Sequence, residues 1–214
     1  MITIITAAWR LDGVKKVIES VDNQTYKNWQ HIIINDNSPE LREWYKKEGY
    51  RHFENEKRHW VDLGIHTGWF GGIVRNIGAM MAFCQFQPKR RDMDNEWICF
   101  LDDDNLWYSN HLETMVKGHK LTPEATLIGV DMEKRGCGNR KYSKLIRCTI
   151  ASNQCDLGNF LYNRKLFERY GYFMPRRERL ITWDYELIEK MAKGEGEDKI
   201  IIVHEPTFIY YSRK

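Results

Sequence analysis

The sequence predicts an α/β fold with a central, mostly parallel sheet of mixed pairing, flanked by helices. Three observations predict it. A strand–helix–strand pattern occupies the first 35 residues, and a buried strand at residues 97–101 runs directly into three aspartates. Shorter strand-like and helical segments then alternate less regularly to the end of the chain.

The first half is predicted from its apolar spacing. Residues 2–6 form a short β-branched run, and residues 31–34 form another, as buried strands do. Between them a helix opens at Asp12, and its expected buried face holds Val14, Val17, Ile18 and Val21. Such a unit implies a parallel strand pair joined by a right-handed crossover.

Further elements follow with the same reasoning. We expect a third strand at 50–54, a glycine-rich loop at 66–72, a helix at 73–86, a charged turn at 88–94, a strand at 97–101 and a helix that buries Leu112, Met115, Val116 and His119. In the second half we expect strands at 126–130, 157–162, 199–203 and 207–211, and helices at 164–170 and around 187–192. Residues 133–147 hold six basic residues and two glycines with little periodicity, which predicts a charged loop.

Composition excludes several classes of protein. The chain has 214 residues, of which 42% are apolar and 29% charged, so disorder, collagen and coiled coils are excluded. Apolar runs such as 32–34 are too short to span a membrane, and the first residues lack the features of a signal peptide. The net charge of +3 is too small to indicate nucleic-acid binding by itself.

The cysteines favour a reducing compartment. Five are present, an odd number, and no two form a Cys-x-x-Cys pair, which argues against a disulfide framework and a zinc ribbon. We therefore expect a cytoplasmic protein, either in solution or on the cytoplasmic face of a membrane.

The main chemical signal is Asp102-Asp103-Asp104, directly after the strand at 97–101. Ligands of open α/β sheets bind outside the carboxyl ends of the strands. Adjacent carboxylates repel one another and favour a bound cation, and their hard oxygens suit Mg²⁺ or Mn²⁺ when a diphosphate adds further ligands. The alternative is a solvated acidic turn.

Weaker signals lie elsewhere. Asp36 can accept hydrogen bonds from a nucleobase or a ribose, but residues 35–38 would also make a good Asx turn. The glycines at 68–72 lead into a helix with Arg75 in its first turn, which favours anions, although no known phosphate loop is matched. Asp184, near the start of a helix, can be either an N-cap or a general base.

Together these segments resemble a known family. Residues 20–38, Ser-Val-Asp-Asn-Gln-Thr-Tyr-Lys-Asn-Trp-Gln-His-Ile-Ile-Ile-Asn-Asp-Asn-Ser, closely resemble the opening of glycosyltransferase family 2, whose members have the Rossmann-like GT-A fold and use nucleotide-sugar donors. The likeness continues through residues 74–78, similar to the family's Ala-Arg-Asn-x-Gly, and through 100–105, similar to its Asp-x-Asp (DXD) metal motif. It reaches residues 171–173 and 183–184, so it spans nearly the whole chain in order.

The resemblance implies a role for individual residues. It assigns the nucleotide site to Thr6, Ala8, Trp9, Asp36, Arg75, Asp102 and Asp103, the metal to Asp104 and Asp102 with His204 as a further candidate, and the catalytic base to Asp184. Ala7-Ala8-Trp9-Arg10 replaces the family's Pro-x-Tyr-Asn, Asn35 an Asp, Asn37 a Gly and Trp183 a Glu. We expect these departures to affect donor choice more than reaction type.

The resemblance thus implies a metal-dependent inverting glycosyltransferase of glycan biosynthesis. It would use Mn²⁺ or Mg²⁺ to move a sugar from a nucleotide sugar, with UDP as the expected nucleotide, to a hydroxyl of a glycan or another acceptor. We expect one catalytic domain over 1–214, with a nucleotide-binding half at 1–105 and an acceptor-binding half at 106–214. Either it is a minimal enzyme, or it is the N-terminal domain of a longer polypeptide.

Two other functions stay open at this point. A nucleotidyltransferase would carry a glycine-rich basic loop after its first strand, where residues 7–11 read Ala-Ala-Trp-Arg-Leu. A non-catalytic sugar-binding module would use surface tryptophans, and turnover of a nucleotide sugar separates it from an enzyme. A nucleic-acid acceptor at the basic residues of 133–147 is less favoured than a solvated loop.

Overall fold

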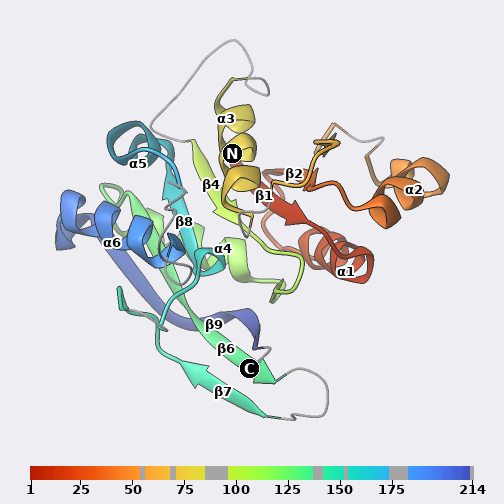
Figure 1. Cartoon of the computed structure of the whole chain (residues 1–214). Coiled ribbons are helices and arrows are strands. Elements are labelled where there is room, and N and C mark those ends of the chain that lie inside the picture. Colours follow the sequence, from red (N-terminus) through yellow and green to blue (C-terminus); the bar gives the residue numbers. More distant parts are fainter. Residues whose placement is uncertain are drawn as a thin grey trace.

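The computed structural model describes residues 1–53, 56–67, 71–84, 96–136, 142–151, 154–173 and 183–212, without the side chains of Cys84, Trp183 and Asp184. Its strands form one sheet in the order β3-β2-β1-β4-β8-β6-β9-β5, with β7 paired to β6 (Figure 1). The strands are β1 (Ile2–Ala8), β2 (Trp29–Asn35), β3 (Arg58–Asp62), β4 (Trp97–Phe100), β5 (Leu106–Trp107), β6 (Leu127–Gly136), β7 (Ser143–Ile146), β8 (Phe160–Asn163) and β9 (Ile200–Ser212).

The parallel half confirms the prediction from the sequence. β1 pairs in parallel with β2 and β4, and β2 pairs in parallel with β3. The crossover from β1 to β2 is α1 (Leu11–Asp22), which buries the four predicted valine and isoleucine positions. The mixed half is also as predicted, because β4 and β6 pair antiparallel with β8 while β6 pairs in parallel with β9.

Helices cover both faces of the sheet. On one face, α3 (Gly72–Cys84), α5 (Arg164–Tyr170) and α6 (Trp183–Glu195) close a core around Ile5 and Phe100. On the other, α1 and α4 (His111–Leu121) pack on the side chains of Ile4 and Cys99. Successive residues of a strand point to opposite faces, so β1 and β4 contribute to both cores. None of the helices in the described ranges has the length and apolar content needed to cross a bilayer.

The predicted third strand was placed wrongly. Residues Gly49–Phe53 form a short 3-10 helix, η1, and the strand beside β2 is β3. A helix, α2 (Pro39–Lys47), precedes them and was missed, although Ser38 caps it and Pro39 begins it. β3 begins with Arg58, which is buried. Its hydrogen bonds to Asp22 and to the carbonyl of His52 offset the cost of burying its charge. A buried, paired arginine does not follow the apolar pattern by which strands are recognised.

The predicted loop at 133–147 is also wrong where the structure describes it. β6 continues to Gly136 and pairs with β7, and these strands extend away from the rest of the molecule with β9 (Figure 1). Two of the charged side chains on β6 pair with each other, Arg135 with Glu133 at 2.7 Å. The two predicted final strands are one strand, β9, with an irregular register where Asp131 faces Pro206.

Other elements agree with their predictions to within a few residues. The helix expected at 73–86 is α3, and the strand expected at 157–162 is a 3-10 turn, η3 (Leu157–Asn159), followed by β8. The charged turn expected at 88–94 lies outside the described residues. Of the described cysteines, Cys99 and Cys148 are buried, and neither they nor Cys155 form a disulfide.

Candidate functional site

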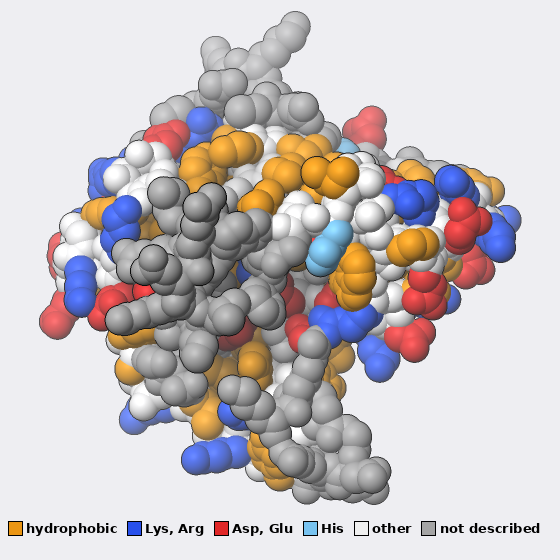
Figure 2. All heavy atoms as spheres, viewed as in Figure 1, with side chains coloured by type: hydrophobic (Ala, Val, Ile, Leu, Met, Phe, Trp, Pro, Cys, Tyr) orange, Lys and Arg blue, Asp and Glu red, His pale blue; other side chains and the backbone are white. Residues whose placement is uncertain are grey.

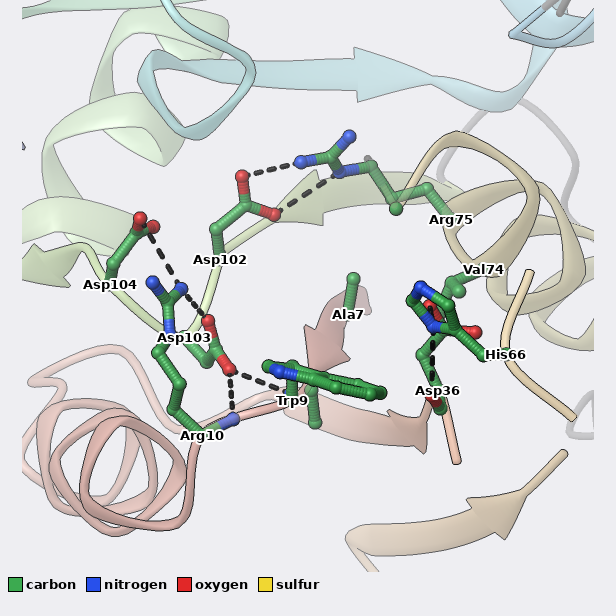
Figure 3. A pocket seen from close by; sticks show the side chains of 12 residues that line it. Ala7, Trp9, Arg10, Asp36, His66, Val74, Arg75, Asp102, Asp103 and Asp104 are labelled. Atoms are coloured by element: carbon green, nitrogen blue, oxygen red, sulfur yellow. Dashed lines mark hydrogen bonds and ion pairs between the residues drawn. The ribbon is translucent and has the colours of Figure 1, made fainter. Parts of the chain in front are cut away.

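A pocket of about 460 Å³ lies at the carboxyl ends of β1, β2 and β4 (Figure 3). This is where an open α/β sheet is expected to bind its ligand. Seen from the same side as Figure 1, acidic and basic side chains lie next to each other near the middle of the face, close to a histidine (Figure 2). The lining residues are Ala7, Ala8, Trp9, Arg10, Asp36, His66, Gly71, Val74, Arg75, Asp102, Asp103 and Asp104.

The middle aspartate of the cluster anchors the turn between β1 and α1. Asp103 is buried, and one of its oxygens accepts the backbone N–H groups of Trp9 at 2.7 Å and Arg10 at 2.6 Å. Its other oxygen accepts from the Arg10 guanidinium. Gly13 permits this close approach, since a Cβ there would lie 1.8 Å from the backbone oxygen of Asp103. The role of Asp103 in this structure is therefore to position Trp9 and Arg10.

Asp102 is held by Arg75, from the first turn of α3. The Arg75 Nε donates to one oxygen of Asp102 at 3.1 Å, and Nη2 donates to the other at 2.5 Å. This paired geometry fixes the carboxylate in orientation. The next residue, Asn76, faces away and exchanges two hydrogen bonds with the backbone of Phe173. Of the Arg-Asn pair, only the arginine serves the pocket.

Asp104 is the most exposed of the three carboxylates, with 30% of its side chain accessible. Arg10 lies beside it, with Nη2 3.3 Å from the Oδ2 of Asp104. Burial and the charge of Asp102 raise the pKa of Asp104, and the opposing effect of Arg10 does not cancel them. Three carboxylates and the two guanidinium groups of Arg10 and Arg75 thus meet at this end of the pocket.

A divalent cation fits this charge pattern. Among the described residues no group of three or more His, Cys, Asp and Glu side chains could hold a metal ion by itself. Asp102 and Asp104 nevertheless offer hard oxygens to the pocket, and Mg²⁺-type ions are commonly held by one or two carboxylates together with phosphate oxygens. His204 is not among the lining residues and instead lies 3.2 Å from Asp131 on β6.

The other end of the pocket is built around Asp36. Its Oδ1 accepts the backbone N–H of Thr67 at 2.8 Å, and its Oδ2 lies 2.9 Å from the Nδ1 of His66. The His66 ring lies 4.7 Å from the indole of Trp9, and both rings are about half exposed. A carboxylate can hydrogen-bond the edge of a nucleobase, and aromatic rings beside it can stack on the plane of the base. His66 was not predicted, because a single histidine in a loop gives no periodic signal.

The turn after β2 shows which residue makes the Asx turn expected at 35–38. Asn35, not Asp36, makes the Asx turn, since its side chain accepts the N–H of Ser38 at 2.8 Å and donates to the Ser38 carbonyl. Asn37 has a φ of 64°, a left-handed conformation that asparagine tolerates better than most residues. Asp36 is left facing the pocket.

Of the other predicted residues, Thr6 does not line the pocket, and the side chain of Asp184 is not described. Thr6 is fully buried under the pocket, and its hydroxyl lies 2.9 Å from His31 Nε2. Asp184 lies in the first turn of α6, and its side chain is outside the description. Residues 68–70 of the predicted glycine-rich loop are outside it as well. Gly71, at a φ of 81°, does line the pocket, where a Cβ would lie 3.3 Å from that of Ala7.

Comparison with known sequences finds glycosyltransferases. Residues 3–182 match the model of a family described as Glycosyl transferase family 2. An uncharacterized glycosyltransferase of Acanthamoeba polyphaga mimivirus is 25% identical over 133 residues, which cover 56% of this chain and 50% of that protein. One from Rickettsia bellii is 31% identical over 121 residues, covering 53% of this chain and 14% of its own. The chain thus matches half or less of the length of these relatives.

Solved structures share the fold. TarS of S. aureus in complex with UDP-GlcNAc has a TM-score of 0.69 at 13% identity, over 100% of this chain and 59% of its own. GalNAc-T7 with UDP, GalNAc and Mn²⁺ has a TM-score of 0.72 at 14% identity, covering 100% and 44%. The mannosyltransferase PcManGT of Pyrobaculum calidifontis with GDP-Man and Mn²⁺ reaches 0.63 at 13%, covering 99% and 56%.

Proposed function

Because the chain belongs to glycosyltransferase family 2, and is thus a glycosyltransferase, we propose that it is a metal-dependent inverting enzyme acting on a UDP-linked sugar. The family and the GT-A fold predicted from the sequence are both confirmed by the comparisons. Metal dependence, stereochemistry, donor and acceptor are the proposal, and each is argued from the pocket or from the family resemblance.

The observation that carries the proposal is the division of the pocket into two chemically different ends. Asp36, His66 and Trp9 form one end, and the aspartates with Arg10 and Arg75 form the other (Figure 3). A nucleoside diphosphate has the same division, with an aromatic base at one end and anionic phosphates at the other. An aspartate at the base end suits a base that presents N–H groups, as uracil does.

Asp104 and Asp102 would hold the cation, with Mn²⁺ or Mg²⁺ as the candidates. When bound, the cation would supply positive charge that stabilises the diphosphate as it leaves the sugar. Arg75 keeps the Asp102 carboxylate oriented for this task. Neighbours of the same fold are described with UDP or GDP-Man together with Mn²⁺, which supports a nucleotide-sugar donor and a divalent cation here.

We assign the catalytic base to Asp184, on the family resemblance and its place in the first turn of α6. The acceptor hydroxyl would give its proton to this carboxylate while its oxygen bonds to the anomeric carbon. The bond from that carbon to the diphosphate breaks on the opposite face, so the configuration at the carbon inverts. A glycan hydroxyl is the proposed acceptor. The cytoplasmic location, the two functional halves and the length of the natural polypeptide stay predictions from the sequence.

A thermal-shift screen of nucleotide sugars with and without Mn²⁺ tests the proposal. A donor at one hundred times its dissociation constant adds about 2.7 kcal/mol to stability, and in a protein of this size that raises Tm by about 5–10 °C. We expect this shift for a UDP-sugar only when Mn²⁺ is present. Glu113→Gln, an exposed carboxylate on α4 away from the pocket, is the control and should respond like the wild type. If no nucleotide sugar raises Tm with Mn²⁺, the proposal is wrong.

A further inference from the structure

Arg10 occupies an unusual place within the acidic cluster. It directly precedes α1, and its guanidinium lies between the carboxylates of Asp103 and Asp104 (Figure 3). A permanent positive charge therefore stands beside the carboxylate that the proposed function gives to the metal.

The two contacts of the guanidinium are unequal. Asp103 is only 3% exposed and is also fixed by the N–H groups of Trp9 and Arg10, so it anchors the side chain. Asp104 is 30% exposed and its contact with Nη2 is longer, at 3.3 Å. Asp104 can therefore separate from the guanidinium while Asp103 continues to hold it.

The present arrangement also leaves part of Arg10 unsatisfied. Its Nε is buried and has no hydrogen-bond partner within the described part of the chain. A buried donor without a partner is costly, so a rearrangement of Arg10 that supplies one would regain part of that free energy.

We propose that Arg10 is an internal counter-ion of Asp104 and competes with the divalent cation for that carboxylate. This inference rests on the proposed function, because it concerns the cation of that site. Two cations close together repel, so the metal binds weakly while the guanidinium is next to Asp104. The diphosphate of a donor brings the negative charge that offsets both cations. Arg10 thereby makes tight metal binding depend on the nucleotide.

Direct titration of Mn²⁺, followed by the electron paramagnetic resonance signal of the free ion, tests this without measuring activity. The proteins are the wild type, Arg10→Met and Lys15→Met, each with and without UDP. Lys15→Met is the matched control. It also removes one positive charge, but from an exposed residue on α1 that pairs with Glu48. Without UDP, we expect Arg10→Met to bind Mn²⁺ at least about tenfold more tightly than the wild type, equal to about 1.4 kcal/mol. Lys15→Met should stay within about twofold.

With UDP present, the advantage of Arg10→Met should shrink, because the diphosphate already offsets the guanidinium in the wild type. A merely structural role for Arg10 would weaken Mn²⁺ binding in the variant, so a gain in affinity distinguishes the two. If Arg10→Met does not fold, Arg10→Gln carries the same expectation, since its amide can still donate to Asp103.

Equal or weaker Mn²⁺ binding by the folded variant without UDP overturns the inference. That result leaves the proposed function intact as long as the wild type binds UDP in a Mn²⁺-dependent way. If the wild type binds neither Mn²⁺ nor UDP at millimolar concentrations, the proposed function and the inference fail together.

Discussion

Replacing Gly13 by alanine tests how the acidic cluster is positioned. In α1 this glycine lies against the backbone of Asp103, and a Cβ would be 1.8 Å from the Asp103 oxygen and 2.9 Å from its carbonyl carbon. Ordinary contact begins near 3.4 Å, so the helix and the loop must separate by roughly 1.6 Å. The hydrogen bonds from Trp9 and Arg10 to Asp103, at 2.7 and 2.6 Å, would then stretch beyond bonding distance.

Both stability and binding are expected to fall. Overpacking costs about 1–3 kcal/mol and each lost hydrogen bond to the buried carboxylate about 1.5–3 kcal/mol, while alanine returns about 1 kcal/mol in helix propensity, so stability falls by about 3–8 kcal/mol. In a chain of this length each kcal/mol lowers Tm by about 2–4 °C, so binding is measured well below the lowered Tm. Because Trp9 and Arg10 lose their anchor on Asp103, we expect the affinity for UDP in the presence of Mn²⁺ to fall at least about tenfold.

Calorimetric titration with UDP and Mn²⁺, together with a melting curve, measures both quantities. Gly118→Ala on α4 is the matched control, because its Cβ meets only side chains, the nearest being Val203 Cγ2 at 2.9 Å. It should lose some stability and keep the wild-type affinity. Wild-type affinity in Gly13→Ala would refute the reasoning that the close approach of α1 positions this end of the pocket.

Three further predictions concern other parts of the account. Asp36→Asn should raise the donor KM by about 10–100-fold with a smaller change in kcat, because the base is bound alike in ground and transition states; the opposite pattern in steady-state kinetics would contradict this role. Asp184→Asn should reduce transfer to an acceptor more than donor hydrolysis, which is checked by measuring glycosylated product and free sugar side by side; equal losses would count against its role as the acceptor's base. Burial lowers the pKa of His31 well below its usual value and that of His111 to about 3, so both are neutral in the folded protein. In the unfolded chain both histidines take up a proton near pH 6.5. The free energy of unfolding should therefore fall on acidification below pH 6.5, by up to about 1.4 kcal/mol per pH unit for each histidine. Urea unfolding at pH 7, 6 and 5 that shows no such fall would contradict this prediction.

The fold was predictable wherever burial follows a simple period. The apolar residues of β1, β2, β4 and α1 are buried as their spacing indicated. The three strands are buried along almost their whole length, and the helix is buried along one face, so the apolar pattern of each is regular. β3 was missed because buried Arg58 depends on Asp22, a partner 36 positions away. The part of β6 beyond residue 130 and β7 were missed because their charged residues give a composition that cannot be distinguished from that of a loop.

The candidate site was predicted in part. Motif residues at strand ends, such as Asp36 and Asp104, do line one pocket, because the carboxyl ends of neighbouring parallel strands share an edge. The sequence did not show which residue of a motif has which role. Asp103 anchors a turn and Asn35 makes one, and these roles depend on which neighbour each side chain meets in the folded chain. His66 and Arg10 belong to the site because of tertiary contacts, which no local sequence pattern indicates.

Release of the nucleoside diphosphate from a UDP-sugar tests the central claim most directly. The assay compares the wild type with Asp104→Asn, each with Mn²⁺ and in chelator-treated buffer, and melting curves confirm that both proteins are folded. We predict that the wild type releases UDP only with the metal and that Asp104→Asn is slower by at least about 100-fold, because the charge on the departing diphosphate is no longer stabilised. Release by Asp104→Asn in chelator-treated buffer at the wild-type rate would contradict the account.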